Sequence, residues 1–251
     1  AGSDPADQAL RLFGQILAVP AGGGRTGTAS AGSGEASQEA AEKFSELNPE
    51  VRVMVIKGPL KNWMSQAKSR ADLFFSGSEH MMSDFVYVFQ DELLPGTIYP
   101  LYFRKSGFIV RKGNPKHIVD LLDLQRPDVN IMVVNGAGLT GMWEDMVGKS
   151  GDMKAFRKVR SNIIVFADNS GLAEKYWKEN SSVDVWITWN IWQIPNADIA
   201  DFVPLDEDYT IYRDCGIALS RKGSENPNAK LFYQFLRSEE VKEIFYKWGW
   251  E

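Results

Sequence analysis

The sequence predicts an α/β protein of two lobes, and three observations support this prediction. Strand-like and helix-like segments alternate along most of the 251 residues. Two long extended runs, at residues 99–112 and 209–220, lie on either side of the second alternating block. Two short helices, expected at about 228–236 and 238–247, end the chain. A chain that passes twice between two lobes needs this order of elements.

The two extended runs set the expected lobe boundaries. We expect the first lobe to be discontinuous and to contain residues 1–101 and 207–251, whereas residues 102–206 form the second lobe. The hinges are then expected near residues 98–106 and 203–213.

Each lobe is expected to contain strands followed directly by helices, an order that predicts parallel strands. In the first lobe the patterns predict strands at 8–14, 51–57 and 71–75, and helices at 35–47, 60–69 and from about Glu79. In the second lobe they predict strands at 130–134, 162–166 and 184–189, and helices at 117–123, 142–149, 153–159 and 170–178.

Composition excludes several classes of protein. A hydrophobic content of 44% is sufficient for packed cores, and the net charge of -5, with scattered Lys and Arg, argues against nucleic-acid partners. No apolar run reaches the roughly 18 residues of a membrane span, so we expect no membrane insertion. The single cysteine, Cys215, excludes an internal disulfide. Residues 1–30 show no signal-peptide pattern, and we expect a mature chain.

The sequence contains no recognisable catalytic motif. His80 and His117 lack the spacing of a metal pair, and HExxH, GxSxG and paired-cysteine motifs do not occur. We therefore expect a protein that is not an enzyme and that needs no metal or cofactor.

Polar residues and glycines follow predicted strands where a helix is about to begin. Ser76, Gly77 and Ser78 follow the strand at 71–75, and Asn169 and Ser170 repeat the arrangement in the second lobe. Each could simply cap a helix. Since the carboxyl ends of strands meet at one edge of a sheet, we expect their hydroxyls and amides to face a shared ligand cleft.

The turn at 136–141 allows three interpretations. It matches GxGxxG after a strand, with Asp168 following the next strand, which is the pattern of an NAD-dependent enzyme. It could also be a plain tight turn. We favour a third interpretation, in which Thr140, Gly141 and nearby amides donate hydrogen bonds to an anion at a helix start.

Aromatic and basic residues extend the candidate site. Trp189 ends a predicted strand and could line the ligand while Thr188 or Asn190 donates a hydrogen bond. Trp63 has a similar position after a turn, and for both indoles core packing is the alternative. The candidate partners for a carboxylate or phosphate are Arg104, Arg160 and Arg213.

Ten stretches, in order over nearly the whole chain from Lys57 onward, resemble the AcfC (accessory colonisation factor) family of periplasmic solute-binding proteins, which is close to the molybdate and sulfate binders. The C-terminal segment from Ala218 onward also resembles that of solute-binding proteins in general. The matching stretches are 57–63 (KGPLKNW), 71–82 (ADLFFSGSEHMM), 100–104 (PLYFR), 110–115 (VRKGNP), 133–138 (VVNGAG), 140–146 (TGMWEDM), 160–164 (RSNII), 186–192 (WITWNIW), 211–213 (IYR) and 248–250 (WGW).

The resemblance implies a type II periplasmic binding protein fold, with a mixed sheet flanked by helices in each lobe and two crossover hinge strands. It implies a periplasmic protein that closes on a small anion, an organic carboxylate, a phosphorylated acid or an oxyanion, and passes it to an ABC-type permease. Carried over to this sequence, the implied ligand contacts are Ser76, Ser78, Thr140, Gly141, Asn169, Ser170 and Trp189.

The sequence departs from the family at its front. The family's first strand leads quickly to a glycine-rich and proline-rich turn that supplies ligand contacts, whereas here residues 14–21 precede a longer glycine-rich stretch at 21–34. Thr26 is the candidate contact there. An adhesion or signalling module on the same fold is a further alternative.

Overall fold

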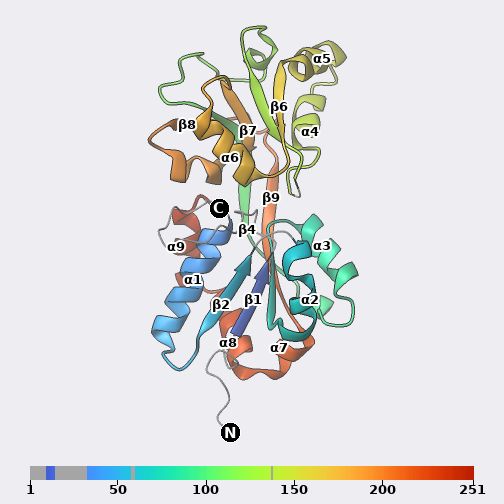
Figure 1. Ribbon diagram of the computed structural model, residues 1–251, viewed down its shortest axis with the longest axis vertical. Helices are drawn as coiled ribbons and strands as arrows, with labels where there is room; N and C mark the ends of the chain where they lie inside the picture. Colours follow the sequence, from blue (N-terminus) through green and yellow to red (C-terminus); the bar gives the residue numbers. More distant parts are fainter. Residues whose placement is uncertain (1–9, 15–32, 58–59, 137) are drawn as a thin grey trace. The chain divides into compact units, whose positions relative to one another are not determined.

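The computed structural model describes residues 10–14, 33–57, 60–136 and 138–251. The described residues form two compact units, each built around β-strands with helices beside them (Figure 1). Unit 1 contains residues 10–14, 33–103 and 213–251, and unit 2 contains residues 104–212. Strands β4 (Tyr99–Arg111) and β9 (Tyr212–Leu219) carry the chain from one unit to the other. The lobe boundaries inferred from the sequence stay a prediction.

The sheet of unit 1 has the strand order β2-β1-β3-β9. Strand β1 (Leu10–Gly14) pairs in parallel with β2 (Val53–Lys57) and with β3 (Leu73–Ser76), as the alternation predicts. Strand β9 pairs with β3 in the antiparallel direction. The sheet is therefore mixed, as expected, because β9 returns from unit 2 and does not follow a helical crossover.

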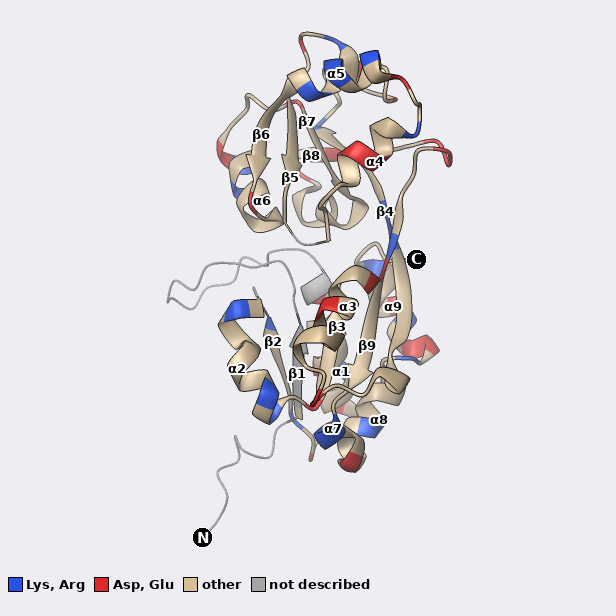
Figure 2. Ribbon diagram, turned by 90° about the vertical axis from the view of Figure 1, so that its right-hand side faces the viewer, with Lys and Arg blue, Asp and Glu red and all other residues tan. Residues whose placement is uncertain are grey.

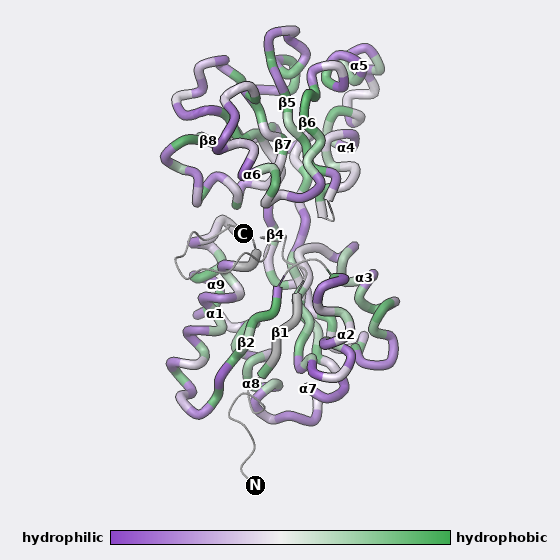
Figure 3. Tube along the Cα trace, viewed as in Figure 1, coloured by the Kyte–Doolittle hydropathy of each residue, from purple (hydrophilic) through white to green (hydrophobic). Residues whose placement is uncertain are grey.

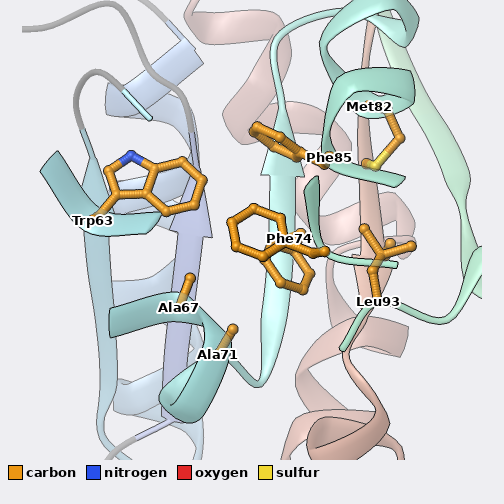
Figure 4. Packing of buried hydrophobic residues seen from close by; sticks show 9 residues of the cluster. Trp63, Ala67, Ala71, Phe74, Met82, Phe85 and Leu93 are labelled. Atoms are coloured by element: carbon orange, nitrogen blue, oxygen red, sulfur yellow. The ribbon is translucent and has the colours of Figure 1, made fainter. Parts of the chain in front are cut away.

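Both faces of the unit 1 sheet are covered by helices. On one face Phe74 packs with Trp63 of α2 (Leu60–Arg70) and with Phe85 of α3 (Glu79–Val88), in the apolar cluster of Figure 4. On the other face Phe75 lies against Phe245, at 6.3 Å between ring centroids. Successive strand residues point to opposite faces, so β3 must be apolar at both positions.

Three further helices complete the second layer of unit 1. Helix α1 (Ser33–Leu47) packs against α9 (Glu239–Lys247) and, through Phe44 and Phe232, against α8 (Pro227–Phe235). The hydropathy colours of Figure 3 show the hydrophobic β2, in green, beside helices in which hydrophobic and hydrophilic residues alternate. The sequence did not indicate the short helix α7 (Arg221–Glu225).

The sheet of unit 2 combines parallel and antiparallel strands in the order β8-β4-β7-β5-β6. Strand β5 (Ile131–Val134) pairs in parallel with β6 (Ile163–Ala167) and β7 (Val185–Trp189). Strand β4 is antiparallel to β7 and to β8 (Ala200–Pro204). The sequence did not indicate strand β8. The helices of unit 2 are α4 (Met142–Gly148), α5 (Met153–Asn162) and α6 (Ser170–Glu179).

The helix expected at 117–123 is wrong. His117 has a positive φ of 51°, and only a single 3₁₀ turn forms, at Asp123–Gln125. Side chains take the amide hydrogens that a helix would use: Asn114 accepts from the Ile118 amide, and Asp120 accepts from those of Leu122 and Asp123. Short polar side chains of this type compete with helical hydrogen bonding.

Arg111 fastens the end of α6 to the sheet of unit 2. Its guanidinium donates hydrogen bonds to the carbonyls of Val183, Trp177 and Asn180. Its Cζ atom also lies 3.6 Å from the ring centroid of Trp177. One planar cation thus satisfies three carbonyls and covers one indole face, which a lysine cannot do.

We predict that Arg111→Lys lowers the free energy of unfolding by about 2 kcal/mol, because two carbonyls lose a charged donor and the ring loses its planar partner. Urea denaturation followed by tryptophan fluorescence measures this loss. Arg157→Lys, on an exposed face of α5, is the matched control and should change stability by less than about 0.5 kcal/mol. Equal stability of the two variants would show that Arg111 does not hold α6.

Candidate functional site

The parallel strands of unit 2 end at one edge of its sheet. Val134 is paired with Ala167 at the ends of β5 and β6. Ile131 is paired with Val185, so that Thr188, three residues further along β7, lies level with Val134. The residues that follow these three strands are therefore neighbours, as expected for the carboxyl edge of a parallel sheet.

The turns after β5 and β6 are in direct contact. The Asn135 amide donates to the Ala167 carbonyl at 2.8 Å. A Cβ atom at Gly136 would lie 2.9 Å from the carbonyl oxygen of Asp168 and 3.3 Å from the Cα of Asn169. Only glycine permits this approach. The structure thus brings the 136–141 turn together with the Asn169 junction.

Three of the sequence-predicted site residues hold local backbone in these turns. The Asn169 side chain accepts from the Leu172 amide at 2.9 Å and caps α6. The exposed Thr140 donates its hydroxyl hydrogen to the Gly136 carbonyl at 3.2 Å. Gly141, with a φ of 77°, precedes α4. Capping does not prevent ligand binding, because a capped helix start retains other unpaired amide hydrogens.

Two hydroxyls at the same edge are buried and unpaired. Ser170 and Thr188 are 0% exposed, and neither hydroxyl has a hydrogen-bond partner within the described part of the chain. Most buried polar groups in proteins are paired, and each exception requires an explanation. A ligand that brings its own acceptors or donors would provide one.

Arg104 and Trp189 form a buried pair in unit 2. Arg104 is 2% exposed on β4, and its Cζ atom lies 4.7 Å from the ring centroid of Trp189, which is fully buried at the end of β7. The neighbouring Asn190 side chain accepts from the Lys105 amide at 3.3 Å. The indole thus packs against a cation, and this contact supports the core-packing alternative for Trp189.

A similar strand end occurs in unit 1. Ser76 is the last residue of β3, is 0% exposed, and has a hydroxyl without a hydrogen-bond partner among the described residues. Gly77 is buried, and the Ser78 hydroxyl accepts from the Met81 amide at 3.2 Å, capping α3. This strand end therefore has the features seen at Ser170, a capped helix start beside a buried, unpaired hydroxyl.

An acidic residue that the sequence did not single out lies at this helix start. The Glu79 amide donates to Oδ1 of Asp214 at 2.7 Å. Burial, followed by repulsion from Asp214, raises the pKa of Glu79 above its ordinary value. The two residues are 135 positions apart in the chain, so local sequence carried no signal of their contact.

The remaining candidates lie elsewhere or outside the described residues. Trp63 is 2% exposed in the core cluster and stacks on Phe89 at 5.8 Å between centroids, which supports its core-packing alternative. Arg160 belongs to the basic helix α5 (Figure 2) and precedes β6, at the opposite end of that strand from Ser170. Arg213 is partly buried on β9. Thr26 lies outside the described residues.

Neither a metal cluster nor a membrane helix is found in the described ranges. His, Cys, Asp and Glu side chains there do not gather in groups of three that could hold a metal ion. None of the helices described here is long and apolar enough to cross a bilayer.

The chain is similar over almost its full length to a solved bacterial protein. PEB3 from Campylobacter jejuni shares 33% identity, with 96% of this chain and 99% of that chain covered and a TM-score of 0.80. A crystal structure of PEB3 with bound L-phospholactate matches with the same identity and coverage and a TM-score of 0.81. No curated protein sequence matches the chain.

More distant structures share the fold. The substrate-binding domain of a putative molybdenum ABC transporter from Clostridium difficile has 17% identity, coverage of 97% of this chain and 98% of that chain, and a TM-score of 0.71. These neighbours confirm the predicted type II periplasmic binding protein fold. The family model for bacterial extracellular solute-binding proteins matches residues 26–251. The chain belongs to this family of bacterial extracellular solute-binding proteins.

Proposed function

We propose that this protein binds a small anion in the periplasm and delivers it to an ABC-type permease. The observation that carries the proposal is the set of buried, unpaired hydroxyls at strand ends, Ser76 in unit 1 and Ser170 and Thr188 in unit 2. In a solute-binding protein, a ligand is the natural partner for such groups.

The chemistry of these strand ends favours an anion. Helices α3 and α6 each begin directly after one of them, and the start of a helix carries a partial positive charge and unpaired amide hydrogens. Neutral hydroxyl and amide donors can hold most of the anion's charge. The costly desolvation of a buried ion pair is then limited to the pair with Arg104 proposed below.

A phosphorylated carboxylic acid is the anion class that we favour. The relative at 33% identity has been crystallised with L-phospholactate, whereas the domain from the putative molybdenum ABC transporter shares only the fold. Arg104, held on Trp189, is the cation that we assign to the carboxylate or phosphate. The ten sequence stretches described above support an AcfC-like role within the family.

An anion that binds one conformation of the protein more tightly than another shifts the population toward that conformation. The prediction from the sequence that the hinges lie near residues 98–106 and 203–213 is part of this proposal.

We predict that Ser76→Ala and Ser170→Ala each weaken the binding of L-phospholactate about tenfold, the effect of losing one buried hydrogen bond to a charged ligand. Isothermal titration calorimetry measures the dissociation constants. The controls are Ser224→Ala in unit 1, partly exposed, and Ser161→Ala in unit 2, exposed; both hydroxyls donate to local carbonyls. The function proposed here is wrong if no small carboxylate, phosphate or oxyanion binds to the wild-type protein.

We also predict that the unpaired hydroxyl of Thr188 costs stability. Thr188→Val should raise the free energy of unfolding of the ligand-free protein by about 1 kcal/mol while weakening anion binding, because valine keeps the shape and removes an unsatisfied polar group. Ser78→Ala, which removes a helix cap, should instead lower stability by about 1 kcal/mol. Urea denaturation tests both, and a destabilised Thr188→Val would mean that this hydroxyl has a structural partner.

A further inference from the structure

We propose that Asp214 makes the unit 1 part of the site select anions that carry a hydrogen-bond donor and reject fully deprotonated tetrahedral oxyanions such as sulfate. The donor can be a hydroxyl group or the protonated oxygen of a phosphate monoanion, the form in which L-phospholactate would be accepted. This inference rests on the proposed function and specifies the class of ligand for the same site.

The Asp214 carboxylate is fixed at the start of α3. Its Oδ1 atom accepts the Glu79 amide hydrogen at 2.7 Å, so the carboxylate occupies a donor that an anion could otherwise use. The helix is ten residues long, and the buried, unpaired Ser76 hydroxyl lies at the end of the strand before it. An anion held by Ser76 therefore meets a negative charge as well as helix amides.

The absence of a side chain at Gly216 leaves a small space beside Asp214. Gly216 is paired with Ser76 across β9 and β3. A Cβ atom at Gly216 would lie 3.6 Å from the Ser76 hydroxyl oxygen, 3.7 Å from Oδ2 of Asp214 and 3.3 Å from the Tyr99 carbonyl oxygen. These three oxygens therefore lie on one side of Gly216, with no Gly216 side chain between them.

The oxygens around this space require a donor. The Asp214 Oδ2 atom is buried and has no hydrogen-bond partner within the described residues, and an ionised carboxylate oxygen only accepts. The Tyr99 carbonyl also only accepts, whereas the Ser76 hydroxyl can donate or accept. A ligand O–H satisfies Asp214, but a bare oxyanion oxygen leaves it unpaired and adds repulsion between like charges.

A second acidic residue lies close to Asp214. Glu79 adds a second carboxylate, and its pKa is raised by burial and by the negative charge of Asp214. Arg213 adjoins Asp214 on β9, where neighbouring residues point to opposite faces of the strand. His80, in the first turn of α3, is exposed.

Hydrogen phosphate and sulfate form the test pair, because at mildly alkaline pH both are tetrahedral dianions of similar size and only phosphate keeps a proton. We expect calorimetry to show that the wild-type protein prefers phosphate about tenfold or more, and that Asp214→Asn removes this preference by gaining sulfate affinity. Asparagine retains an acceptor for the Glu79 amide, so the variant should fold, and its melting curve checks this. Ser76→Ala should weaken both anions and leave their ratio unchanged.

The outcomes separate this inference from the proposed function. If anions bind but the ratio of phosphate to sulfate affinity is the same in wild type and Asp214→Asn, the role of Asp214 is wrong and the proposed function stands. If neither these two anions nor L-phospholactate binds wild type or Asp214→Asn, the proposed function fails, and the selectivity with it.

Discussion

The requirement that a buried polar atom must find a partner governs both the stability and the function of this chain. Ser76, Ser170 and Thr188 are fully buried, yet their hydroxyls have no partner in the described structure. Their positions are not random, because Ser76 and Thr188 lie near the ends of strands and Ser170 begins the helix that follows one, all at the carboxyl edge of a sheet. The surrounding strands and helices hold these hydroxyls in place, although each unpaired hydroxyl lowers the stability of the ligand-free protein.

The same strand ends also show how capping and binding can share one helix start. Ser78 and Asn169 each accept the amide of the residue three positions later, and the neighbouring serines, Ser76 and Ser170, keep their hydroxyls unpaired. The cap fixes where the helix begins, so the unpaired hydroxyl is presented from a rigid element. Rigid presentation lowers the entropy lost when a ligand is bound.

The fold and the positions of Ser76 and Ser170 could be predicted from the sequence, because they depend on local patterns. Alternating strands and helices placed Ser76 and Ser170 at strand ends. Strand β8 was not predicted, because Asp and Pro weaken its strand pattern. The prediction of a helix at 117–123 was wrong, because the side chains of Asn114 and Asp120 accept hydrogen bonds from nearby amides. Asp214 was missed because its contact with Glu79 joins distant residues, which no local pattern encodes.

A carboxylate among neutral donors has a general consequence for the strength and selectivity of a site. Hydroxyls and amides attract every small anion to a similar degree, so they supply affinity with little discrimination. An acceptor fixed at Asp214 adds a repulsive element that only a ligand with a correctly placed proton can convert into a hydrogen bond. A ligand with the proton pairs Asp214, and a ligand without it leaves the carboxylate unpaired. The difference in binding free energy between these two ligands is larger than the gain from one more neutral donor, because an unpaired buried charge costs more than a hydrogen bond contributes. Selectivity is therefore strongest where an attractive site contains one group that the wrong ligand cannot satisfy.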